Sequence, residues 1–267
     1  MGRIEWRIER ECEDAVRALE AAGPLPPPVE AAFRRKSKRR IWRLPPAPGV
    51  PKGAFLKQYL GRGGLLGFRD TLWISKTWRE ARRIRRCAAA GLPTPRLLAV
   101  GADWRGMLRD STYLLTEAAG ETRTIRNALR DADGPGRRAA IEAAARAVRG
   151  MHEAGFAHGD LHPDNILLRE SPAGAVEVVF IDLPSSRGIA SPAPRPDAFL
   201  SPLMAQDLAQ VFAFSRAVCS MADARFALHA YLRAAGAERF PIGILREIAD
   251  AMTEENLRRL KAASGPG

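Results

Sequence analysis

The chain has 267 residues, of which 46% are hydrophobic and 27% are charged. This composition is typical of a folded globular protein, and it excludes a disordered, collagen-like or fibrous chain. Single hydrophobic cores stop growing at about 250 to 300 residues, so the length suits one large domain or two lobes. The three cysteines lie far apart in the sequence and favour neither a disulfide framework nor a zinc site.

The sequence carries no visible secretory or membrane-spanning segment. The first residues run quickly into mixed charge and lack the apolar centre of a signal peptide. Nor does the sequence hold a run of about 18 apolar residues that could cross a bilayer. We therefore expect a cytoplasmic protein, with any membrane contact being peripheral.

The positive charge is concentrated in one part of the chain. Lysine and arginine outnumber aspartate and glutamate by 42 to 30, a formal net charge of +12, and the sequence pI is about 10.5. Residues 31–86 alone contain 17 basic and two acidic residues. Such a basic face suits phosphates, nucleic acid or an anionic membrane, or it is a solvated arginine-rich surface. No helix-turn-helix, zinc-finger or RNP motif accompanies the charge, so we expect no specific nucleic-acid partner.

The start of the chain predicts an extension followed by strands. Residues 11–22 suggest a helix, and the prolines that follow Gly23 indicate a stiff linker. We therefore expect residues 1–30 to form an N-terminal extension with a proline linker. Runs that mix apolar and basic residues at 33–44 and 54–60 predict two or three strands of a sheet.

One helix and two strands come next. Ser75 can cap a helix that runs to about Ala90, where Gly91 ends it and two prolines prevent its continuation. Short apolar runs at 97–100 and 113–116 then predict a strand pair.

The second half of the chain predicts mainly helices. Apolar residues at helical spacing over 141–151 indicate an amphipathic helix that stops at Gly155. An apolar run at 176–181 predicts a buried strand, and residues 207–219 predict a further helix. The order of elements, a sheet with one helix followed mostly by helices, indicates the α+β class.

The most informative stretch is a loop that carries an aspartate and an asparagine five residues apart. Asp160 and Asn165 follow the amphipathic helix, and Asp182 comes directly after the buried strand. A lone aspartate in such a loop is usually a turn or cap residue. Phosphoryl transfer from ATP, however, needs a carboxylate that orients a hydroxyl and accepts its proton, together with oxygen ligands for Mg²⁺. The three residues together predict Asp160 as the catalytic base and Asn165 and Asp182 as magnesium ligands.

These motifs resemble those of the protein-kinase-like superfamily, and the resemblance extends over most of the chain after about Phe33. It implies that Lys57 binds the phosphates of ATP and that Glu80, on the next helix, is its ion-pair partner. It also implies that backbone groups of Glu117 and Ala119 hydrogen-bond adenine in the hinge. Taken alone, Lys57 would be an ordinary strand lysine, and Glu80 could pair with the arginines around it on the surface.

The resemblance also implies the architecture. We expect a bilobal protein-kinase-like fold, with an antiparallel-sheet N-lobe that carries one helix and the hinge over residues 31–119. A mainly helical C-lobe over residues 120–267 would end in a short flexible tail. Asp207 would be the buried helix aspartate that braces the catalytic loop.

Within this superfamily, the sequence resembles the lipopolysaccharide core kinase family (Kdo/WaaP-like). Local features that carry the resemblance are Phe55–Lys57, the glycine turn 61–64, Gly91–Pro95, Met151–Gly155 and Ile181–Leu183. The resemblance implies an ATP- and Mg²⁺-dependent phosphotransferase that acts on heptose or Kdo in a lipid-linked core oligosaccharide. It would work at the cytoplasmic face of the inner membrane, in peripheral contact with anionic lipid.

Other functions stay open from the residues alone. The catalytic loop equally resembles that of aminoglycoside and choline kinases, which would make the chain a soluble kinase of a small hydroxyl-bearing molecule. A Ser/Thr protein kinase would use the same residues, although residues 187–202 lack the usual peptide-anchoring motif. A non-catalytic basic binding module, a pseudokinase, is a further alternative.

Two departures from the kinase pattern bear on mechanism. No G-x-G-x-x-G motif precedes Lys57, so we expect the loop that covers the phosphates to be an atypical turn at Pro45–Gly53. Asp182 is followed by Leu183 and Pro184 in place of Phe and Gly, which argues against the usual conformational switch in this segment.

Overall fold

The chain divides into two compact units, which are Met1–Ala89 with Thr94–Gly120 and Ala90–Pro93 with Glu121–Gly267. The computed structural model describes residues 4–36, 39–61, 75–105, 108–171, 174–183, 187–188, 202–215, 218–234, 250 and 253. The glycine turn expected after Gly61 and nearly all of the segment at 187–202 lie outside the described residues.

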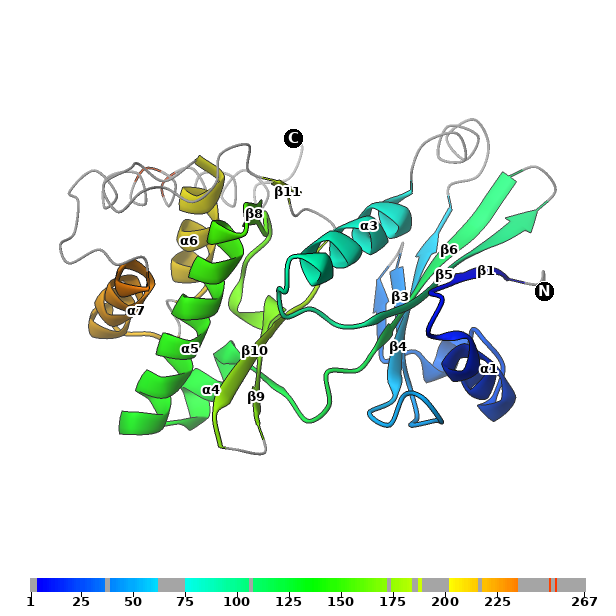
Figure 1. Cartoon of the computed structure of the whole chain (residues 1–267), viewed down its shortest axis with the longest axis horizontal. Coiled ribbons are helices and arrows are strands. Elements are labelled where there is room, and N and C mark those ends of the chain that lie inside the picture. The colour runs from blue at the N-terminus through cyan, green and yellow to red at the C-terminus, as the bar shows by residue number, and fades with distance from the viewer. Residues whose placement is uncertain are drawn as a thin grey trace. The chain divides into compact units, whose positions relative to one another are not determined.

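The first unit is built on a six-stranded sheet in which every neighbouring pair is antiparallel (Figure 1). The strand order is β1-β5-β6-β4-β3-β2. Its strands are β1 (Glu5–Ile8), β2 (Arg34–Lys36), β3 (Arg39–Leu44), β4 (Ala54–Leu60), β5 (Leu97–Arg105) and β6 (Leu108–Glu117). The strands predicted from the sequence are therefore present, and β1 is an additional one that the sequence did not reveal.

Two helices, α1 (Glu13–Ala22) and α3 (Lys76–Ala89), cover opposite faces of this sheet. Leu56 on β4 is buried in one core with Val16 of α1, whereas the next residue along the strand, Lys57, pairs with α3. Successive side chains of a strand point to opposite faces, so the two helices lie on different sides of β4.

The helix α3 begins and ends where the sequence predicted. The side-chain oxygen of Ser75 accepts a hydrogen bond from the amide of Trp78 (3.4 Å), and the chain turns at Gly91, whose φ is +72°. The buried residues of α3 recur at helical spacing, which places one stripe of the helix against the sheet. They are Thr77, Glu80, Ala81, Ile84 and Cys87.

The structure corrects the expectation that residues 1–30 form an extension. β1 pairs with β5, and Leu19 of α1 is only 2% exposed in the core of the sheet. The proline segment is also attached, because the indole nitrogen of Trp42 donates a hydrogen bond to the carbonyl oxygen of Pro28 (3.0 Å). After the short η1 (Val29–Ala31), the chain enters β2. The mixed charge of this segment concealed the apolar stripe that α1 buries.

The second unit is mainly helical. Its helices are α4 (Ile125–Asp131), α5 (Gly134–Glu153), α6 (Pro202–Ser215) and α7 (Met221–Arg233), with the short η2 (Pro163–Asn165). Its strands are β7 (Arg123–Thr124), β8 (Phe156–Ala157), β9 (Ile166–Glu170), β10 (Val176–Phe180) and β11 (Arg187–Gly188). They form two small sheets, ordered β10-β9-β7 and β11-β8, and α5 packs against α7 and β10.

Two helix predictions for this unit can be compared with the structure. The amphipathic helix expected before Gly155 is α5, which ends at Glu153. The helix expected over 207–219 instead starts at Pro202 and ends at Ser215. Proline is tolerated in the first turn of a helix, where its missing amide hydrogen has no intrahelical partner.

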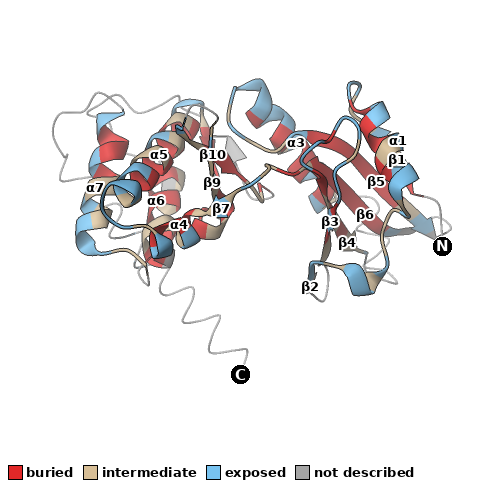
Figure 2. Ribbon diagram, turned by 90° about the horizontal axis from the view of Figure 1, so that it is seen from below, coloured by how far each residue is buried: buried red, intermediate tan, exposed pale blue. Residues whose placement is uncertain are grey.

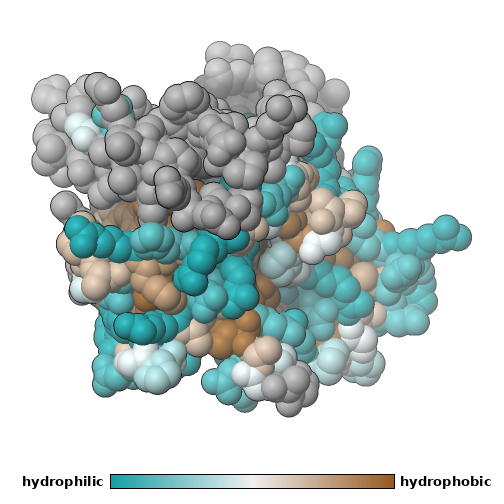
Figure 3. Space-filling view, turned by 60° about the vertical axis from the view of Figure 1, so that its left-hand side comes forward, coloured by the Kyte–Doolittle hydropathy of each residue, from teal (hydrophilic) through white to brown (hydrophobic). Residues whose placement is uncertain are grey.

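The structure confirms the α+β class. Buried residues are concentrated along the central strands of the first unit and along the inner sides of α5 and α6 (Figure 2). On the face drawn in Figure 3, hydrophilic residues surround separate apolar patches. Among the residues that the structure describes, no helix is both long and apolar enough to cross a membrane.

We predict that α1 is part of the core that stabilises the first unit. Leu19→Ala should lower the free energy of unfolding of this unit by about 2 to 5 kcal/mol, because it removes buried methyl groups and leaves a cavity. All five tryptophans precede residue 105, so urea denaturation followed by tryptophan fluorescence reports on the first unit. Arg17→Ala, an exposed position on the same helix, is the control. Equal effects of the two substitutions would contradict the prediction.

Candidate active site

A buried ion pair joins the sheet and the helix of the first unit. The ammonium nitrogen of Lys57, on β4, lies 2.7 Å from Oε1 of Glu80, on α3. The hydroxyl of Tyr59 donates a hydrogen bond to Oε2 of the same carboxylate (2.9 Å). Strand alternation places Lys57 and Tyr59 on one face of β4. Both oxygens of Glu80, which is 1% exposed, are therefore bonded.

This geometry fixes a positive charge on the face of the sheet that α3 covers. A buried carboxylate is stable only when its charge is compensated, so Glu80 holds the ammonium of Lys57 within reach. A lysine held in this way is the arrangement with which kinases bind the phosphates of ATP. The ion pair expected between these residues is present, and their role toward a nucleotide stays a prediction.

The end of β6 carries the two residues expected to bind adenine. The side chain of Glu117 accepts a hydrogen bond from the guanidinium of Arg96 (2.9 Å), and its amide donates to the carbonyl oxygen of the same arginine. The amide of Ala118 donates to the carbonyl oxygen of Gly53 (2.9 Å). These bonds fix the backbone at Glu117 and Ala118, within the segment where the contact at Glu117 and Ala119 is expected. The contact with adenine itself stays a prediction.

The turn at Pro45–Gly53 is the segment expected to cover the phosphates of ATP, and that role stays a prediction. It abuts the end of β6, because Gly53 accepts the bond from Ala118. Gly53 also has a φ of +77°, and a Cβ there would lie 2.4 Å from the carbonyl oxygen of Leu44. The described residues of β2 and β3 pair up to Lys36 and Arg39, and Arg39 is in register with Tyr59 of β4.

A buried aspartate holds the loop of the second unit that carries Asp160, the expected catalytic base. Asp207, on α6, is 0% exposed, and its carboxylate accepts hydrogen bonds from the amides of His158 (2.6 Å) and Gly159 (2.8 Å). One turn further along the helix, the side-chain oxygen of Gln210 accepts a bond from the amide of Leu161 (2.7 Å). The expected bracing role of Asp207 is thus visible in the bonds that it makes. The loop that carries Asp160 is fixed through its backbone, and Asp160 stands between the anchored amides.

The next bonds bring Asp160, Asn165 and the segment before Asp182 together. The side-chain amide nitrogen of Asn165 donates to the carbonyl oxygen of Asp160 (2.9 Å). The backbone carbonyl of Asn165 accepts from the amide of Ile181 (3.0 Å), the residue before Asp182. Asp182 has a φ of 60°, and it is the one residue other than glycine with a positive φ among those described. Such a backbone is unfavourable for a residue with a Cβ, and it often occurs at functional sites.

The donor set suits a magnesium ion. Because the amide nitrogen of Asn165 is used in the bond to Asp160, its Oδ1 is the atom that carries lone pairs for a cation. Asp182 supplies a carboxylate, and Mg²⁺ takes few protein ligands because it keeps waters and substrate phosphates. No group of three or more His, Cys, Asp or Glu side chains that could enclose a metal occurs within the described ranges.

His158 links the catalytic loop to the segment at Asp182. Its ring nitrogen Nε2 lies 3.0 Å from the carbonyl oxygen of Ile181 and must donate the hydrogen, since a carbonyl only accepts. The ring packs edge-on to Phe180. Burial lowers the pKa of His158, and Asp207 opposes this shift only in part. The ring is therefore neutral near pH 7, and it acts as a brace, not as a base.

A further chain of bonds runs from Asp207 to α7. Nε2 of His152 lies 3.2 Å from the carboxylate of Asp207, and Nδ1 of the same ring lies 2.8 Å from the hydroxyl of Tyr231. Burial raises the pKa of Tyr231 to about 12. Sequence reasoning missed Gln210 and Tyr231. The spacing of Gln210, three residues after Asp207 on one helix, was a usable signal, whereas Tyr231 meets the site only through tertiary packing.

The two units thus carry different parts of the expected site. The first unit holds Lys57 and Glu80 in contact with each other, with Glu117 and Ala119 at the end of β6. In the second unit, the bonds of Asn165 connect Asp160 with the segment that leads into Asp182. That both groups of residues act on one nucleotide stays a prediction.

Comparison with known proteins identifies a family and a fold. The model of the lipopolysaccharide kinase (Kdo/WaaP) family matches residues 52–208, more than half of the 267-residue chain. A solved structure of WaaP in complex with acyl carrier protein is 23% identical and has a TM-score of 0.60, and the alignment covers 96% of this chain and 98% of that one. The expected protein-kinase-like fold is thereby confirmed.

Two more distant similarities were also found. A probable bifunctional tRNA threonylcarbamoyladenosine biosynthesis protein of Methanothermobacter thermautotrophicus is 31% identical over 168 residues, which is 58% of this chain. The alignment spans 28% of the length of that curated relative. A Rio2 kinase complex from Chaetomium thermophilum has a TM-score of 0.47 at 16% identity, over 84% of this chain and 70% of that one.

The neutral state of His158 predicts acid sensitivity in the second unit. Its folded pKa lies below the unfolded value of about 6.5, so the unfolded chain takes up the proton more readily. Stability is therefore present above that pH and falls below it, by at most about 1.4 kcal/mol per pH unit. His158→Gln should reduce this dependence, since glutamine does not titrate. Hydrogen exchange of the amides at 158–170 between pH 7.5 and 5.5 measures it, and identical profiles for the two proteins would contradict the prediction.

Proposed function

The chain belongs to the lipopolysaccharide kinase (Kdo/WaaP) family, and on that premise we propose that it transfers the γ-phosphate of ATP to a sugar hydroxyl of the lipopolysaccharide core. It is a kinase, and heptose and Kdo are the acceptors that we propose. The observation that carries the proposal is the anchored loop at Asp160, held by the buried Asp207 and tied to Asn165.

In the proposed reaction, Asp160 orients the acceptor and takes its proton. The hydroxyl oxygen attacks the γ-phosphorus, the bond to the bridging oxygen of ADP breaks, and the proton passes to the carboxylate of Asp160. The anchored backbone supports this role, because an oriented base needs a fixed position. Asn165 and Asp182 would hold Mg²⁺, which supplies charge stabilisation at the phosphates.

The first unit would bind the nucleotide. Lys57, held by the buried carboxylate of Glu80, would neutralise phosphate oxygens. Backbone groups of Glu117 and Ala119 would hydrogen-bond adenine, at a segment already fixed by bonds to Arg96 and Gly53. We therefore propose ATP and Mg²⁺ as the cofactors of the chain.

The proposal competes with a soluble kinase of a small hydroxyl-bearing molecule. We predict that the purified chain, given Mg²⁺ and ATP, phosphorylates unphosphorylated core oligosaccharide on lipid A. It should not phosphorylate an aminoglycoside, choline or a model protein. Transfer to one of these and none to core sugar would favour the soluble kinase and overturn the acceptor that we propose.

The base is tested separately by Asp160→Ala. The substitution should lower kcat about a hundred- to ten-thousandfold, because it removes general-base assistance. ATP affinity, measured by calorimetry, should change little. Asp131→Ala, at the exposed end of α4, is the matched control. Near wild-type transfer by Asp160→Ala would refute the mechanism.

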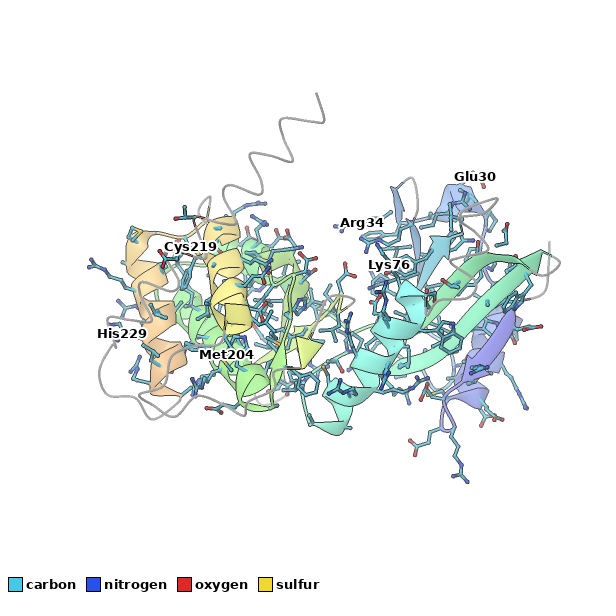
Figure 4. All side chains as sticks on the ribbon, turned by 90° about the horizontal axis from the view of Figure 1, so that it is seen from above. Glu30, Arg34, Lys76, Met204, Cys219 and His229 are labelled. Carbon is cyan, nitrogen blue, oxygen red and sulfur yellow. The ribbon has the colours of Figure 1, made fainter. Side chains whose placement is uncertain are left out.

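We also propose that the chain works at the cytoplasmic face of the inner membrane, in peripheral contact with anionic lipid. The outer side of α3 carries an exposed basic stripe, made of Lys76, Arg79, Arg82 and Arg86. Lys76 begins that helix (Figure 4), and its one acid, Glu80, is buried on the opposite side. Each basic residue near an anionic leaflet contributes about 1 kcal/mol, so a few suffice for reversible attachment.

Vesicle binding tests this location. The chain should co-sediment with anionic vesicles at low salt, dissociate as salt rises, and ignore neutral vesicles. Charge reversal at Arg79 and Arg82 should weaken binding about tenfold or more, whereas reversal at Arg130 and Arg146, exposed in the second unit, should have a smaller effect. Equal binding to both kinds of vesicle, or to neither, would reject the electrostatic attachment.

A further inference from the structure

The segment at the start of the chain touches the helix that carries Glu80. The guanidinium of Arg85, near the end of α3, donates through Nε to Oε1 of Glu9 (3.0 Å). The guanidinium carbon of Arg7 lies 5.1 Å from the centre of a ring of Trp78, near the start of α3. Trp78 and Arg85 are seven residues apart and therefore share one side of the helix. Two contacts about two turns apart thus connect one short segment to α3.

The residues that make these contacts are themselves held by the sheet. Trp6 packs on Tyr113 (6.0 Å between ring centres) on the side of the sheet that α1 covers, so Arg7 points to the opposite side, where α3 lies. The amide of Glu9 donates to the carbonyl oxygen of Leu98 (2.9 Å). Because β1 is a strand of the sheet and α1 is buried in its core, the segment is a fixed support.

The other side of α3 depends on this support. Glu80 lies between Trp78 and Arg85 in the helix and faces the sheet, where it meets Lys57 at 2.7 Å. A shift of α3 by 1 to 2 Å, typical of packed helices, would break this pair and leave a buried carboxylate without its cation.

We propose that Arg7 and Glu9 are positioning residues that hold α3 so that Glu80 stays paired with Lys57. This inference rests on the proposed function, in which Lys57 binds the phosphates of ATP. Contacts at the surface are individually weak, so each is expected to shift the population of the paired arrangement only severalfold. A smaller population of the competent arrangement lowers the apparent affinity for ATP in proportion.

The first test compares variants of the full chain by kcat/KM for ATP. Arg7→Gln with Glu9→Gln should lower it about five- to tenfold, with a melting temperature close to that of the unchanged chain. The matched control is Glu13→Gln with Arg17→Gln, which removes an exposed ion pair of α1 and should leave kcat/KM unchanged. A loss of equal size in this control would overturn the proposal.

Rescue and epistasis separate positioning from general stability. Glu9→Arg should impair the enzyme, and adding Arg85→Glu should restore most of the activity, because the pair is re-formed with its charges exchanged. In a Glu80→Gln background, Arg7→Gln with Glu9→Gln should change kcat/KM less than twofold, since the group that they position is gone. If the loss of kcat/KM in the combined variant equals the product of the two separate losses, the proposal is overturned.

The activity of Glu80→Gln alone distinguishes a failure of the proposed function from a failure of the positioning role. Wild-type activity in Glu80→Gln would refute the site assignment in the proposed function, and this inference with it. An impaired Glu80→Gln variant, together with unimpaired Arg7→Gln and Glu9→Gln, would refute only the positioning role. We expect Glu80→Gln to be impaired, and Arg7→Gln with Glu9→Gln to be impaired as well. We also expect that the two losses do not multiply when the substitutions are combined.

Discussion

The hydrogen bonds to the buried carboxylate of Asp207 are the interactions on which the path of the loop at Asp160 depends. Removing a carboxylate from water is costly, and Asp207 is stable inside the unit because two loop amides and an imidazole bond to it. The same bonds that satisfy Asp207 determine the path of the loop at His158 and Gly159. Stability and site geometry therefore have one cause here, which explains how a short irregular segment between β8 and β9 holds a defined shape.

The first unit also buries a carboxylate, that of Glu80, but side chains compensate its charge there. Glu80 is as deeply buried, but its compensation comes from one ammonium and one hydroxyl at the tips of the Lys57 and Tyr59 side chains. Glu80 bonds to the tips of two side chains, whereas Asp207 bonds to backbone amides of the loop itself. The fold thus combines a loop that is held through its backbone with an ion pair that, in our proposal, depends on the position of α3.

Local signals predicted the elements that are governed by local chemistry. Ser75, Gly91 and the nearby prolines bounded α3 correctly, and the resemblance at Lys57 anticipated the ion pair. The sequence did not reveal that residues 1–30 join the sheet, because the mixed charge of α1 masks a narrow apolar stripe and the pairing of β1 with β5 is non-local. The sequence also did not reveal where the turn at Pro45–Gly53 lies in the first unit, for a similar reason. Its position beside Ala118 depends on strand order, which spacing along the chain does not encode.

The backbone at Asp182 adopts a left-handed conformation that is unfavourable for its side chain. A left-handed conformation costs a residue with a Cβ about 1 to 2 kcal/mol, and glycine would adopt it without strain. Glycine, however, has no carboxylate that could bind a cation. Ile181, the residue before Asp182, is fixed by its bonds to Asn165 and His158. These bonds hold the backbone of Asp182 in the left-handed conformation, so the surrounding structure offsets the unfavourable free energy. Position 182 is therefore less stable locally than the fold could achieve, and in the mechanism that we propose the compensation is an oxygen ligand for Mg²⁺.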